Sequence, residues 1–515
     1  MTTPTAIGPA QGGPTSALGR HLARLLLFAA SPEAGPARLG FLGAIMITTG
    51  GLGAGSTRLH DPLLESLHLS WLRFGHGLVL SSVLLWGGVA LMTVAWLGLG
   101  RRVVDKAAVS EYTMLATTAF WLTPLLLSVP VFSRDTYSYL AQGALLRDGF
   151  DPYVVGPIDN PNSLLDNVSP IWTTTTAPYG PAFILIAKFV TMIVGNHVVE
   201  GTMLLRLCML PGLALLIWAA PRVARHVGAN GAVALWICVL NPLVIIHLMG
   251  GVHNEMLMVG LMMAAIALTF GGRPIWGVSL IAIAVAVKAT AGIALPFMVW
   301  VWMRKLRDTR GYRPVPAFAV ATAASAAIFV AVFAVLSWLA GVGLGWLTAL
   351  AGSVKIINWL TVPTATANII NTVGGLFIPV NFYAVLDITR IIGVAVIAIS
   401  LPLLWWRFRH DDREALTGIT LAMLVVVLFV PAALPWYYTW PLAVLSALAQ
   451  SRAAIALIAG FSTWIMVIFK PDGSHGMYSW IHVALATACA IGAWRFLAKA
   501  PQAPEPSRPS PEPAG

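Results

Sequence analysis

The sequence predicts an all-α fold, a polytopic bundle of about 14 transmembrane helices with further helices lying along the outer face. Three observations carry this prediction. Hydrophobic residues make up 58% of the 515 residues, only 10% are charged, and the mean hydropathy is strongly positive. A soluble domain would expose too much of this apolar surface to stay in solution. The apolar residues also fall into runs suited to cross a bilayer, with basic residues gathered between them.

Fourteen apolar runs are expected to cross the membrane as helices. They are residues 39–55, 77–99, 112–132, 202–220, 232–247, 255–271, 274–287, 291–303, 315–338, 382–406, 416–430, 437–449, 453–469 and 478–497. The seventh and eighth runs are short, so residues 274–303 are expected to form two short or broken helices that turn near 288–292. Lys288 at this turn would lie in the outer half of the membrane and would need an anionic partner.

Arginine and lysine residues set the expected orientation, because such residues favour cytoplasmic loops. The basic clusters lie at 20–38, 101–106, 222–225, 304–313, 407–409 and 495–499. All of them face the cytoplasm, together with both termini, if residues 181–195 do not cross. This segment has about fifteen residues with Lys188 in the middle, so it is expected to be an interfacial helix on the outer leaflet. Residues 346–375 are expected to form a second outer-face segment.

The chain is expected to divide into three parts in the plasma membrane. Residues 1–38 form a largely disordered cytoplasmic segment, 39–499 the transmembrane catalytic domain, and 500–515 a disordered, proline-rich cytoplasmic tail. The net charge of +11 follows from the basic cytoplasmic loops and does not indicate a nucleic-acid partner. The three cysteines are scattered through apolar spans, which argues against disulfides, zinc and iron–sulfur clusters.

A polar segment at 133–201, expected on the outer face, interrupts the apolar runs and is the expected catalytic loop. It begins with Asp135, which suits a general base that deprotonates a sugar hydroxyl without requiring a metal. The alternative is an ordinary loop aspartate paired with Arg134. Arg147, Asp148, Asp151, Tyr153 and Tyr179 could serve as loop scaffolding or as acceptor contacts, and composition does not decide between the two.

Two further polar groups are expected on the same face as Asp135. His253, Asn254 and Glu255 open a helix, where Asn254 suits an N-cap and Glu255 favours the positive helix end. A metal role would need further ligands at regular spacing, and none is visible, so no metal is expected. The residues Trp436, Tyr437, Tyr438 and Trp440 either belong to the interfacial aromatic belt or stack on sugar rings and prenyl chains.

The motifs and their order resemble a known superfamily. An outer loop that opens with an aspartate precedes "YGPAFILIAKF", "VAVKATAGIALP" and "LPWYYTWPL", as in GT-C integral membrane glycosyltransferases. At finer grain, "SRDTYSYLAQGALLRDGFDPYVVGP", "DNVSPIWTTTTAPYGPAF" and "LMGGVHNEMLMVGL" resemble the actinobacterial polyprenol-phosphate-mannose-dependent α-(1→6)-mannosyltransferases called MptB. The resemblance runs from about residue 39 to 497.

The resemblance implies an enzyme of the GT-C type. It would transfer mannose from polyprenyl-phosphate-mannose to a mannosylated phosphatidylinositol or another lipid-linked mannan acceptor on the periplasmic face, in lipomannan and lipoarabinomannan biosynthesis. The implied mechanism is a single inverting displacement with Asp135 as base and no cofactor. The donor phosphate would be bound by Lys288, Arg206 and His253. Expected substrate-binding residues are Arg134, Tyr137, Asp151, Tyr153, Tyr179, Asn254, Glu255, Trp436, Tyr437 and Tyr438.

Two other classes of function are consistent with a polytopic membrane protein. A transporter or flippase of a lipid-linked sugar should show paired broken helices in two halves and a polar path through the membrane. The sequence has no internal repeat, and its polar residues gather at one face. A structural subunit would not need Asp, His, Glu and Lys clustered on that face.

Overall fold

The computed structural model describes residues 17–105, 109–350 and 355–499. Within these ranges the chain is helical, apart from loops and one isolated antiparallel bridge between Phe469 and His475. The predicted all-α class is therefore confirmed. The disorder expected for residues 1–16 and 500–515 concerns residues outside the described part of the chain.

The helices follow one another in four groups. The first contains α1 (Ala17–Ala30), η1 (Pro32–Ala34), α2 (Gly35–Ala54), α3 (Pro62–Ser66), η2 (Ser70–Arg73), α4 (Gly75–Val104) and α5 (Glu111–Leu125). The second, the polar loop, contains α6 (Asp135–Arg147), η3 (Pro157–Asp159), η4 (Leu165–Asn167), η5 (Pro170–Trp172) and α7 (Pro181–Val194).

The third group contains α8 (Val198–His226), α9 (Gly231–Cys238), α10 (Pro242–Val244), η6 (Ile245–Gly250), α11 (Glu255–Phe270), α12 (Pro274–Val287), η7 (Ala289–Ala294), α13 (Leu295–Arg310) and α14 (Pro314–Ala340). The last group contains α15 (Trp346–Ala349), α16 (Val362–Ile369), η9 (Ile370–Gly374), α17 (Phe382–Arg407), α18 (Asp412–Phe429), η10 (Pro435–Tyr438), α19 (Thr439–Leu445), α20 (Arg452–Ile468) and α21 (Trp480–Ala498).

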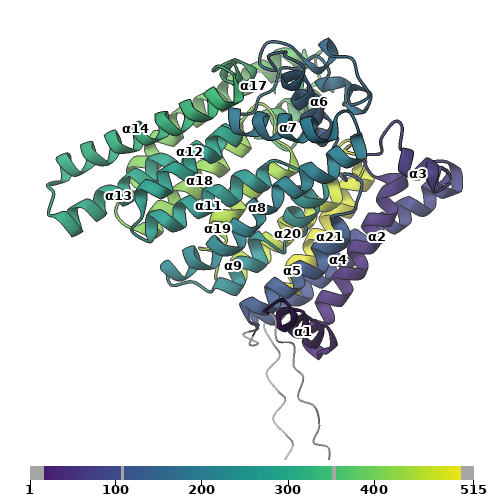
Figure 1. Ribbon diagram of the computed structural model, residues 1–515, viewed down its shortest axis with the longest axis horizontal. Helices are drawn as coiled ribbons and strands as arrows, with labels where there is room; N and C mark the ends of the chain where they lie inside the picture. The colour runs from purple at the N-terminus through teal and green to yellow at the C-terminus, as the bar shows by residue number, and fades with distance from the viewer. Residues whose placement is uncertain (1–16, 106–108, 351–354, 500–515) are drawn as a thin grey trace, which may run out of the picture.

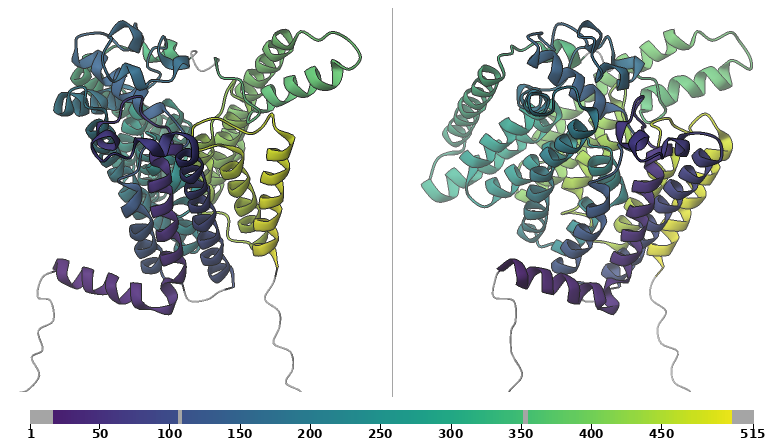
Figure 2. Two further views of the ribbon diagram at one scale, coloured as in Figure 1. Left: turned by 90° about the vertical axis from the view of Figure 1, so that its right-hand side faces the viewer. Right: turned by 45° about the vertical axis from the view of Figure 1, so that its right-hand side comes forward.

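The long helices run side by side, and the polar loop with α6 and α7 covers one end of the bundle (Figure 1). Helix α1 and the C-terminal end of α21 lie at the opposite end (Figure 2). Arg101 near the end of α4 donates to the carbonyl oxygens of Phe496 and Lys499, which ties α4 to the end of α21. The two ends of the described chain therefore share one face of the bundle.

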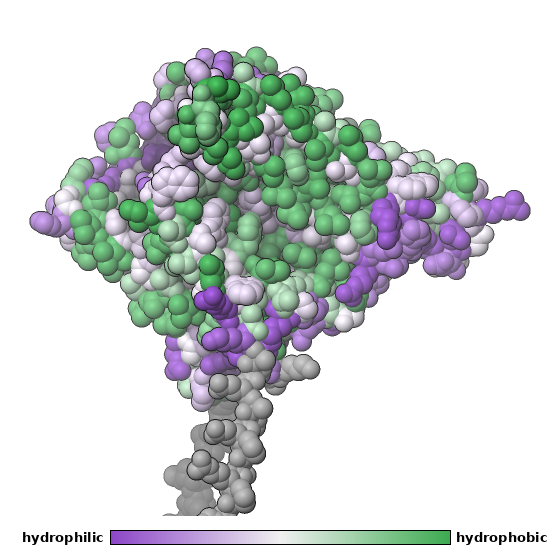
Figure 3. All heavy atoms as spheres, turned by 180° about the vertical axis from the view of Figure 1, so that it is seen from behind, coloured by the Kyte–Doolittle hydropathy of each residue, from purple (hydrophilic) through white to green (hydrophobic). Residues whose placement is uncertain are grey.

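In the described part of the chain, six helical segments are long and apolar enough to cross a membrane: Pro32–Ala54, Gly75–Val104, Val198–His226, Pro314–Ala340, Phe382–Arg407 and Trp480–Ala498. The pair Gly231–Cys238 and Pro242–Gly250 is bent by 45° and would make a seventh as one broken span. Large exposed apolar side chains occur along these helices, and apolar residues cover much of the face in Figure 3. The chain is a multi-pass membrane protein.

Several predicted spans are shorter than a bilayer in the structure. Helices α11, α12 and α20 have 14 to 17 residues, which at 1.5 Å per residue is about 21–26 Å. The count of fourteen is therefore not confirmed. Residues 274–303 do form two helices, α12 and α13, joined by Lys288 and η7, as the sequence predicted.

The N-terminal segment differs from the expectation of a largely disordered 1–38. Residues 17–30 form α1, and α2 already begins at Gly35. Phe28 of α1 packs edge-on against Tyr112 and Phe120 of α5, with ring centroids 6.2 Å apart in both pairs. An amphipathic segment can fold when its apolar face is buried, as the contacts of Phe28 show here. The basic composition of this region made that helix hard to predict.

Close packing on α8 holds helix α11, which begins with Glu255, in a fixed position. A Cβ atom added to Gly260 would lie 1.9 Å from the carbonyl oxygen of Gly212, so only glycine permits this approach. The residues before α11 form the π-helical turn η6, a conformation often found at functional sites. This packing fixes where His253 and Glu255 meet the polar loop.

Candidate active site

Asp135 is the first residue of α6, and its backbone N–H donates to Ser133 Oγ at 3.0 Å. Burial, and then the neighbouring charge of Glu255, raises the pKa of Asp135 to about 7. Lys288 and hydrogen bonds from Ser133 and Trp172 act in the opposite direction. A carboxylate with a pKa near neutrality can both accept and release a proton at physiological pH, which suits a general base.

His253, Glu255 and Lys288 converge on Asp135 from two other elements. His253 Nδ1 lies 3.7 Å from Asp135 Oδ2 and 4.0 Å from Glu255 Oε2. The Lys288 ammonium forms an ion pair with Glu255, whose side chain is fully buried. The anionic partner that Lys288 was expected to need is thus Glu255. The four groups form one cluster in which two carboxyl groups, an imidazole and an ammonium lie close together.

Aromatic rings enclose this cluster. Trp436 stacks on the His253 ring with centroids 3.7 Å apart and planes inclined by 23°. The Lys288 ammonium lies 4.5 Å from the ring centroid of Tyr437 and 5.8 Å from that of Tyr179. These rings exclude water and attract the cation, so the charges interact in a medium of low polarity.

Backbone strain borders the cluster on two sides. Phe132, three residues before Asp135, has φ of 67°, and Val252, next to His253, has φ of 57°. A left-handed conformation is unfavourable for a side chain branched at Cβ such as valine. Each costs on the order of 1–3 kcal/mol and persists only where the surrounding structure enforces it. Such strain is typical of functional sites.

Two neighbouring cavities share Asp135 in their lining, and we call them together the aspartate cavity. The larger, about 300 Å³, extends from Asp135 toward Trp436 and the turn at Asp472. The smaller, about 50 Å³, extends from Asp135 toward Lys288 and Tyr437. The same carboxylate thus faces a small compartment with a cation and a larger one with room for a second substrate.

Comparison with known proteins assigns the chain to a family. Residues 37–304 match the family described as "Alpha-(1->6)-mannopyranosyltransferase, N-terminal domain", and residues 363–499 match the "MptB C-terminal domain". The chain belongs to the MptA/MptB mannosyltransferase family. Its members include "Alpha-(1->6)-mannopyranosyltransferase A" of Mycobacterium tuberculosis, which is 72% identical over 97% of both chains.

Two relatives from Corynebacterium glutamicum match at lower identity. "Alpha-(1->6)-mannopyranosyltransferase A" is 38% identical over 87% of this chain and 95% of the relative. "Alpha-(1->6)-mannopyranosyltransferase B" is 30% identical over 84% of this chain and 76% of the relative. The resemblance seen in the sequence is confirmed, and this chain is a glycosyltransferase. Among these three relatives, identity is higher to the two named A.

The structure of this MptA/MptB family member brings most of the predicted site residues together. Those that line the aspartate cavity are Arg134, Asp135, Tyr179, Lys288, Trp436 and Tyr437. Arg134 lies beside Asp135 but donates to the carbonyl oxygens of Thr57 and Asn167. The alternative in which Asp135 is a loop aspartate paired with Arg134 therefore does not describe the structure. Asn254 is fully buried next to Glu255.

The structure gives Arg206 a different position from the expected one. Its guanidinium is fully buried and donates to the backbone carbonyls of Leu126, Met249 and Gly250, at 2.8 to 3.2 Å. These bonds hold the end of α5 and the turn η6 against α8. Because its donors are committed to the backbone, Arg206 has a structural role at this position.

Four other predicted substrate-binding residues make scaffold contacts. The hydroxyls of Tyr137, Tyr153 and Tyr438 donate to the carbonyls of Ser56, Tyr179 and Leu360, respectively, at 2.6 to 2.8 Å. The Asp151 carboxylate accepts from the backbone N–H of Tyr153 at 2.8 Å, as in an Asx turn. Tyr137, Asp151 and Tyr153 support the polar loop, and Tyr438 connects η10 to the segment at Leu360. The sequence did not distinguish such structural contacts from substrate binding.

Several cavity residues were not predicted from the sequence, among them Ser138, Gln142 and Trp172. Ser138 and Gln142 follow Asp135 on α6 at the i+3 and i+7 positions, so helical spacing would have found them. Trp172 comes from η5, and no local pattern marks it. The Ser138 hydroxyl and the Gln142 carbonyl oxygen are buried without a hydrogen-bond partner among the described residues. Buried polar atoms of this kind are available to bind a hydroxylated ligand.

Proposed function

We propose that this enzyme transfers mannose from polyprenyl-phosphate-mannose to the 6-hydroxyl of a lipid-linked mannan acceptor, with Asp135 as general base. The observation that carries the proposal is the position of Asp135 between the compartment at Lys288 and the larger compartment at Trp436. A transferase needs one group in contact with both substrates, and Asp135 is placed for that. The names of the relatives supply the α-(1→6) linkage.

The reaction is a single inverting displacement. Asp135 accepts the proton of the acceptor O6 while that oxygen bonds to C1 of β-mannosyl phosphate. The bond between C1 and the phosphate oxygen breaks, and polyprenyl phosphate leaves with the bonding electrons. Its low basicity makes a general acid unnecessary. Positioned general bases contribute typically 10²–10⁴-fold, and the elevated pKa of Asp135 makes it a stronger base than a free carboxylate.

Lys288 is the proposed partner of the donor phosphate. Its ammonium has three donors, and one of them is used by Glu255. Lys288 lines the small compartment, where the leaving phosphate would develop its charge. His253 lines the other side of Asp135 and has a buried Nε2 atom without a hydrogen-bond partner among the described residues. We propose that it orients Asp135 or the phosphate.

The prenyl chain and the orientation complete the proposal. An apolar groove of about 550 Å³ begins at Gly292 and Ile293, close after Lys288 in the chain, and continues to Trp405. A prenyl chain attached to a phosphate at Lys288 would lie in it. Basic residues that favour the cytoplasm, including Arg304 and Arg307, lie in the C-terminal part of α13 and not in the polar loop. We therefore place both termini in the cytoplasm and the site on the periplasmic face, in lipomannan and lipoarabinomannan biosynthesis.

The test is transfer from radiolabelled polyprenyl-phosphate-mannose to a dimannoside, in membranes that contain the full chain. Asp135→Asn should lower the rate about 10²–10⁴-fold without changing protein abundance, because the amide cannot accept the proton. Asp148→Asn, at the other end of the same helix, is the matched control and should retain activity.

Three further readings of this assay bear on the proposal. The product linkage should be α-(1→6). We propose that no divalent metal is needed, so activity should survive EDTA. Near-normal turnover by purified Asp135→Asn protein would refute the role of Asp135. Complete loss of activity with EDTA and its rescue by Mn²⁺ would instead indicate that Asp135, His253 and Glu255 bind a metal ion.

A further inference from the structure

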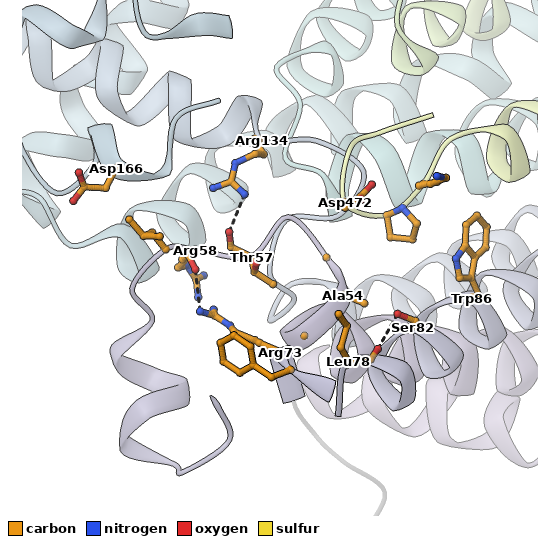
Figure 4. A pocket seen from close by; sticks show the side chains of 16 residues that line it. Ala54, Thr57, Arg58, Arg73, Leu78, Ser82, Trp86, Arg134, Asp166 and Asp472 are labelled. Atoms are coloured by element: carbon orange, nitrogen blue, oxygen red, sulfur yellow. Dashed lines mark hydrogen bonds between the residues drawn. The ribbon is translucent and has the colours of Figure 1, made fainter. Parts of the chain in front are cut away.

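A second cavity lies beside the aspartate cavity on the side of the first helical hairpin. It has a volume of about 650 Å³ and lies between the end of α2, the start of α4 and the turn at Lys470–Asp472 (Figure 4). Arg134 and Asp472 line both cavities. We call this one the basic cavity, because its lining includes Arg58, Arg73, Arg134 and Lys470.

Two of these arginines are held in place by one carboxylate. Arg58 and Arg73 both bond to Asp61 Oδ2, at 2.7 and 3.1 Å, and Arg73 also donates to the Arg58 carbonyl at 2.9 Å. Arg58 is only 4% exposed. The Nε atoms of both arginines are buried without a hydrogen-bond partner among the described residues. Such donors in a cavity wall are available to an anion.

The charged side chains around the basic cavity have an excess of one positive charge. Four cationic side chains face three carboxylates, those of Asp61, Asp166 and Asp472. The excess of one positive charge matches a phosphodiester, which carries one negative charge. Arg134 contributes to this excess, because its guanidinium donates to the Thr57 and Asn167 carbonyls and not to a carboxylate (Figure 4).

The rest of the lining is apolar and faces outward. Leu78, Ser82 and Trp86 lie on one face of α4 at i, i+4 and i+8, and Phe74 precedes the helix. Phe74 is 71% exposed and Leu78 41% exposed, on a helix that is long and apolar enough to cross the membrane. A cavity with arginines at one end and exposed apolar side chains at the other fits an amphiphile with an anionic head group.

We infer that the basic cavity binds the anionic phosphodiester head group of a membrane lipid that anchors the acceptor. Its acyl chains lie along Phe74 and Leu78. The glycan attached to it passes Arg134 into the aspartate cavity and reaches Asp135. The identity of this lipid as the acceptor anchor rests on the proposed function, whereas the binding of an anionic lipid does not.

The binding test uses native mass spectrometry of the detergent-solubilised full chain with phosphatidylglycerol, phosphatidylcholine or inorganic phosphate as probes. Phosphatidylglycerol should bind at least about fivefold more tightly than phosphatidylcholine. Arg73→Gln and Lys470→Gln should each weaken it at least about fivefold. Arg222→Gln, which removes the same charge from an exposed site on α8, is the matched control. Equal binding by the variants and the wild type, or equal affinity for both lipids, overturns the inference.

A second measurement connects the lipid to the acceptor. Lys470→Gln should raise KM at least about fivefold for an oligomannoside carried on an anionic phosphodiester lipid, and should leave KM unchanged for the same glycan on a neutral alkyl chain. An equal effect on both acceptors overturns the anchor role. If inorganic phosphate alone displaces phosphatidylglycerol at equal concentration, the cavity is a phosphate site and not a lipid site. Should wild-type protein transfer mannose to neither acceptor yet bind phosphatidylglycerol, the proposed function fails and the lipid site stands.

Discussion

At the scale of single residues, groups from distant parts of the chain meet around the carboxylate of Asp135. Asp135, Glu255, Lys288 and Tyr437 were predicted on one face, and the structure brings them together. Arg206 was predicted to bind a phosphate, but its guanidinium donates to backbone carbonyls. The sequence does not distinguish a buried structural arginine from one that binds a ligand. The charge environment of Asp135 depends on burial and on a neighbour 120 residues away, which no local pattern encodes.

The raised pKa of Asp135 predicts the pH dependence of transfer. If the ionised form is the base, kcat/KM should rise about tenfold per pH unit below 7 and level off above it. The measurement is a rate profile from pH 5 to 9 with a donor whose phosphate does not titrate in this range. A half-maximal value below about pH 5 would contradict the assignment.

The same shift also has a consequence for stability. Between pH 3.8 and about 7 the native state holds a proton that the unfolded state releases, so this group lowers stability as pH rises. Asp135→Asn should reduce this loss, and its Tm should exceed that of the wild type most clearly above pH 7.

The ion pair between Lys288 and Glu255 predicts a separation of stability from activity. Removing one partner leaves a buried charge without compensation, so Lys288→Met and Glu255→Gln should each destabilise the protein by about 3–5 kcal/mol. The double variant removes both charges and should recover most of this stability. Because the phosphate loses its cation, transfer should remain low in the two variants that lack Lys288. The measurements are thermal unfolding in detergent and transfer rate. Recovery of transfer by the double variant would show that the pair only supports the fold.

At the scale of elements, hydropathy located the helices well and their ends poorly. The turn at Lys288 was predicted, because a lysine cannot lie in the middle of a continuous apolar helix without a partner. Trp172 and the turns of η3 to η5 could not be predicted, since they depend on contacts between distant segments. The helices shorter than a bilayer look like full spans in sequence, because burial against other helices and burial in lipid select the same apolar residues.

Helix α7 illustrates this ambiguity and can be tested directly. Its 14 residues extend about 21 Å, less than the ~30 Å of a bilayer core. It packs against α6 and α8, and Asn196 just beyond it accepts a hydrogen bond from Arg147 at 2.9 Å. If α7 stays on the outer face, a cysteine at Asn196→Cys should react with an impermeant thiol reagent in intact cells.

The matched control for this experiment is Asp308→Cys, near the end of α13, which should react only after permeabilisation. The wild-type chain gives the background from Cys208, Cys238 and Cys489. Labelling of Asn196→Cys only in permeabilised cells would contradict the outer-face position of α7 and the topology that depends on it.

At the scale of the whole molecule, the polar loop caps a bundle whose lateral surface faces lipid. The apolar groove opens beside η7, α13 and α17, whereas the basic cavity lies at α2 and α4. The basic cavity shares Arg134 with the aspartate cavity, and the apolar groove begins at Gly292, close after Lys288 in the chain. Under the proposed function, this arrangement lets two membrane-bound substrates approach one carboxylate from separate parts of the bundle, so neither has to leave the bilayer before the other enters.

The apolar groove should therefore determine the selectivity for the donor chain. Leu401 lines it on α17, and a Leu401→Trp substitution would fill part of its volume. KM for a long-chain polyprenyl-phosphate-mannose should rise at least about tenfold, since each buried methylene contributes about 0.8 kcal/mol and several would be displaced. KM for a donor with a two-isoprene chain should change little, because that chain would end before the obstruction.

The matched control is Leu403→Trp, two residues further on the same helix. The Leu403 side chain is 63% exposed, so this substitution adds the same bulk outside the groove and should leave both KM values unchanged. Equal KM values for wild type and Leu401→Trp with the long donor would place the prenyl chain elsewhere on the bundle.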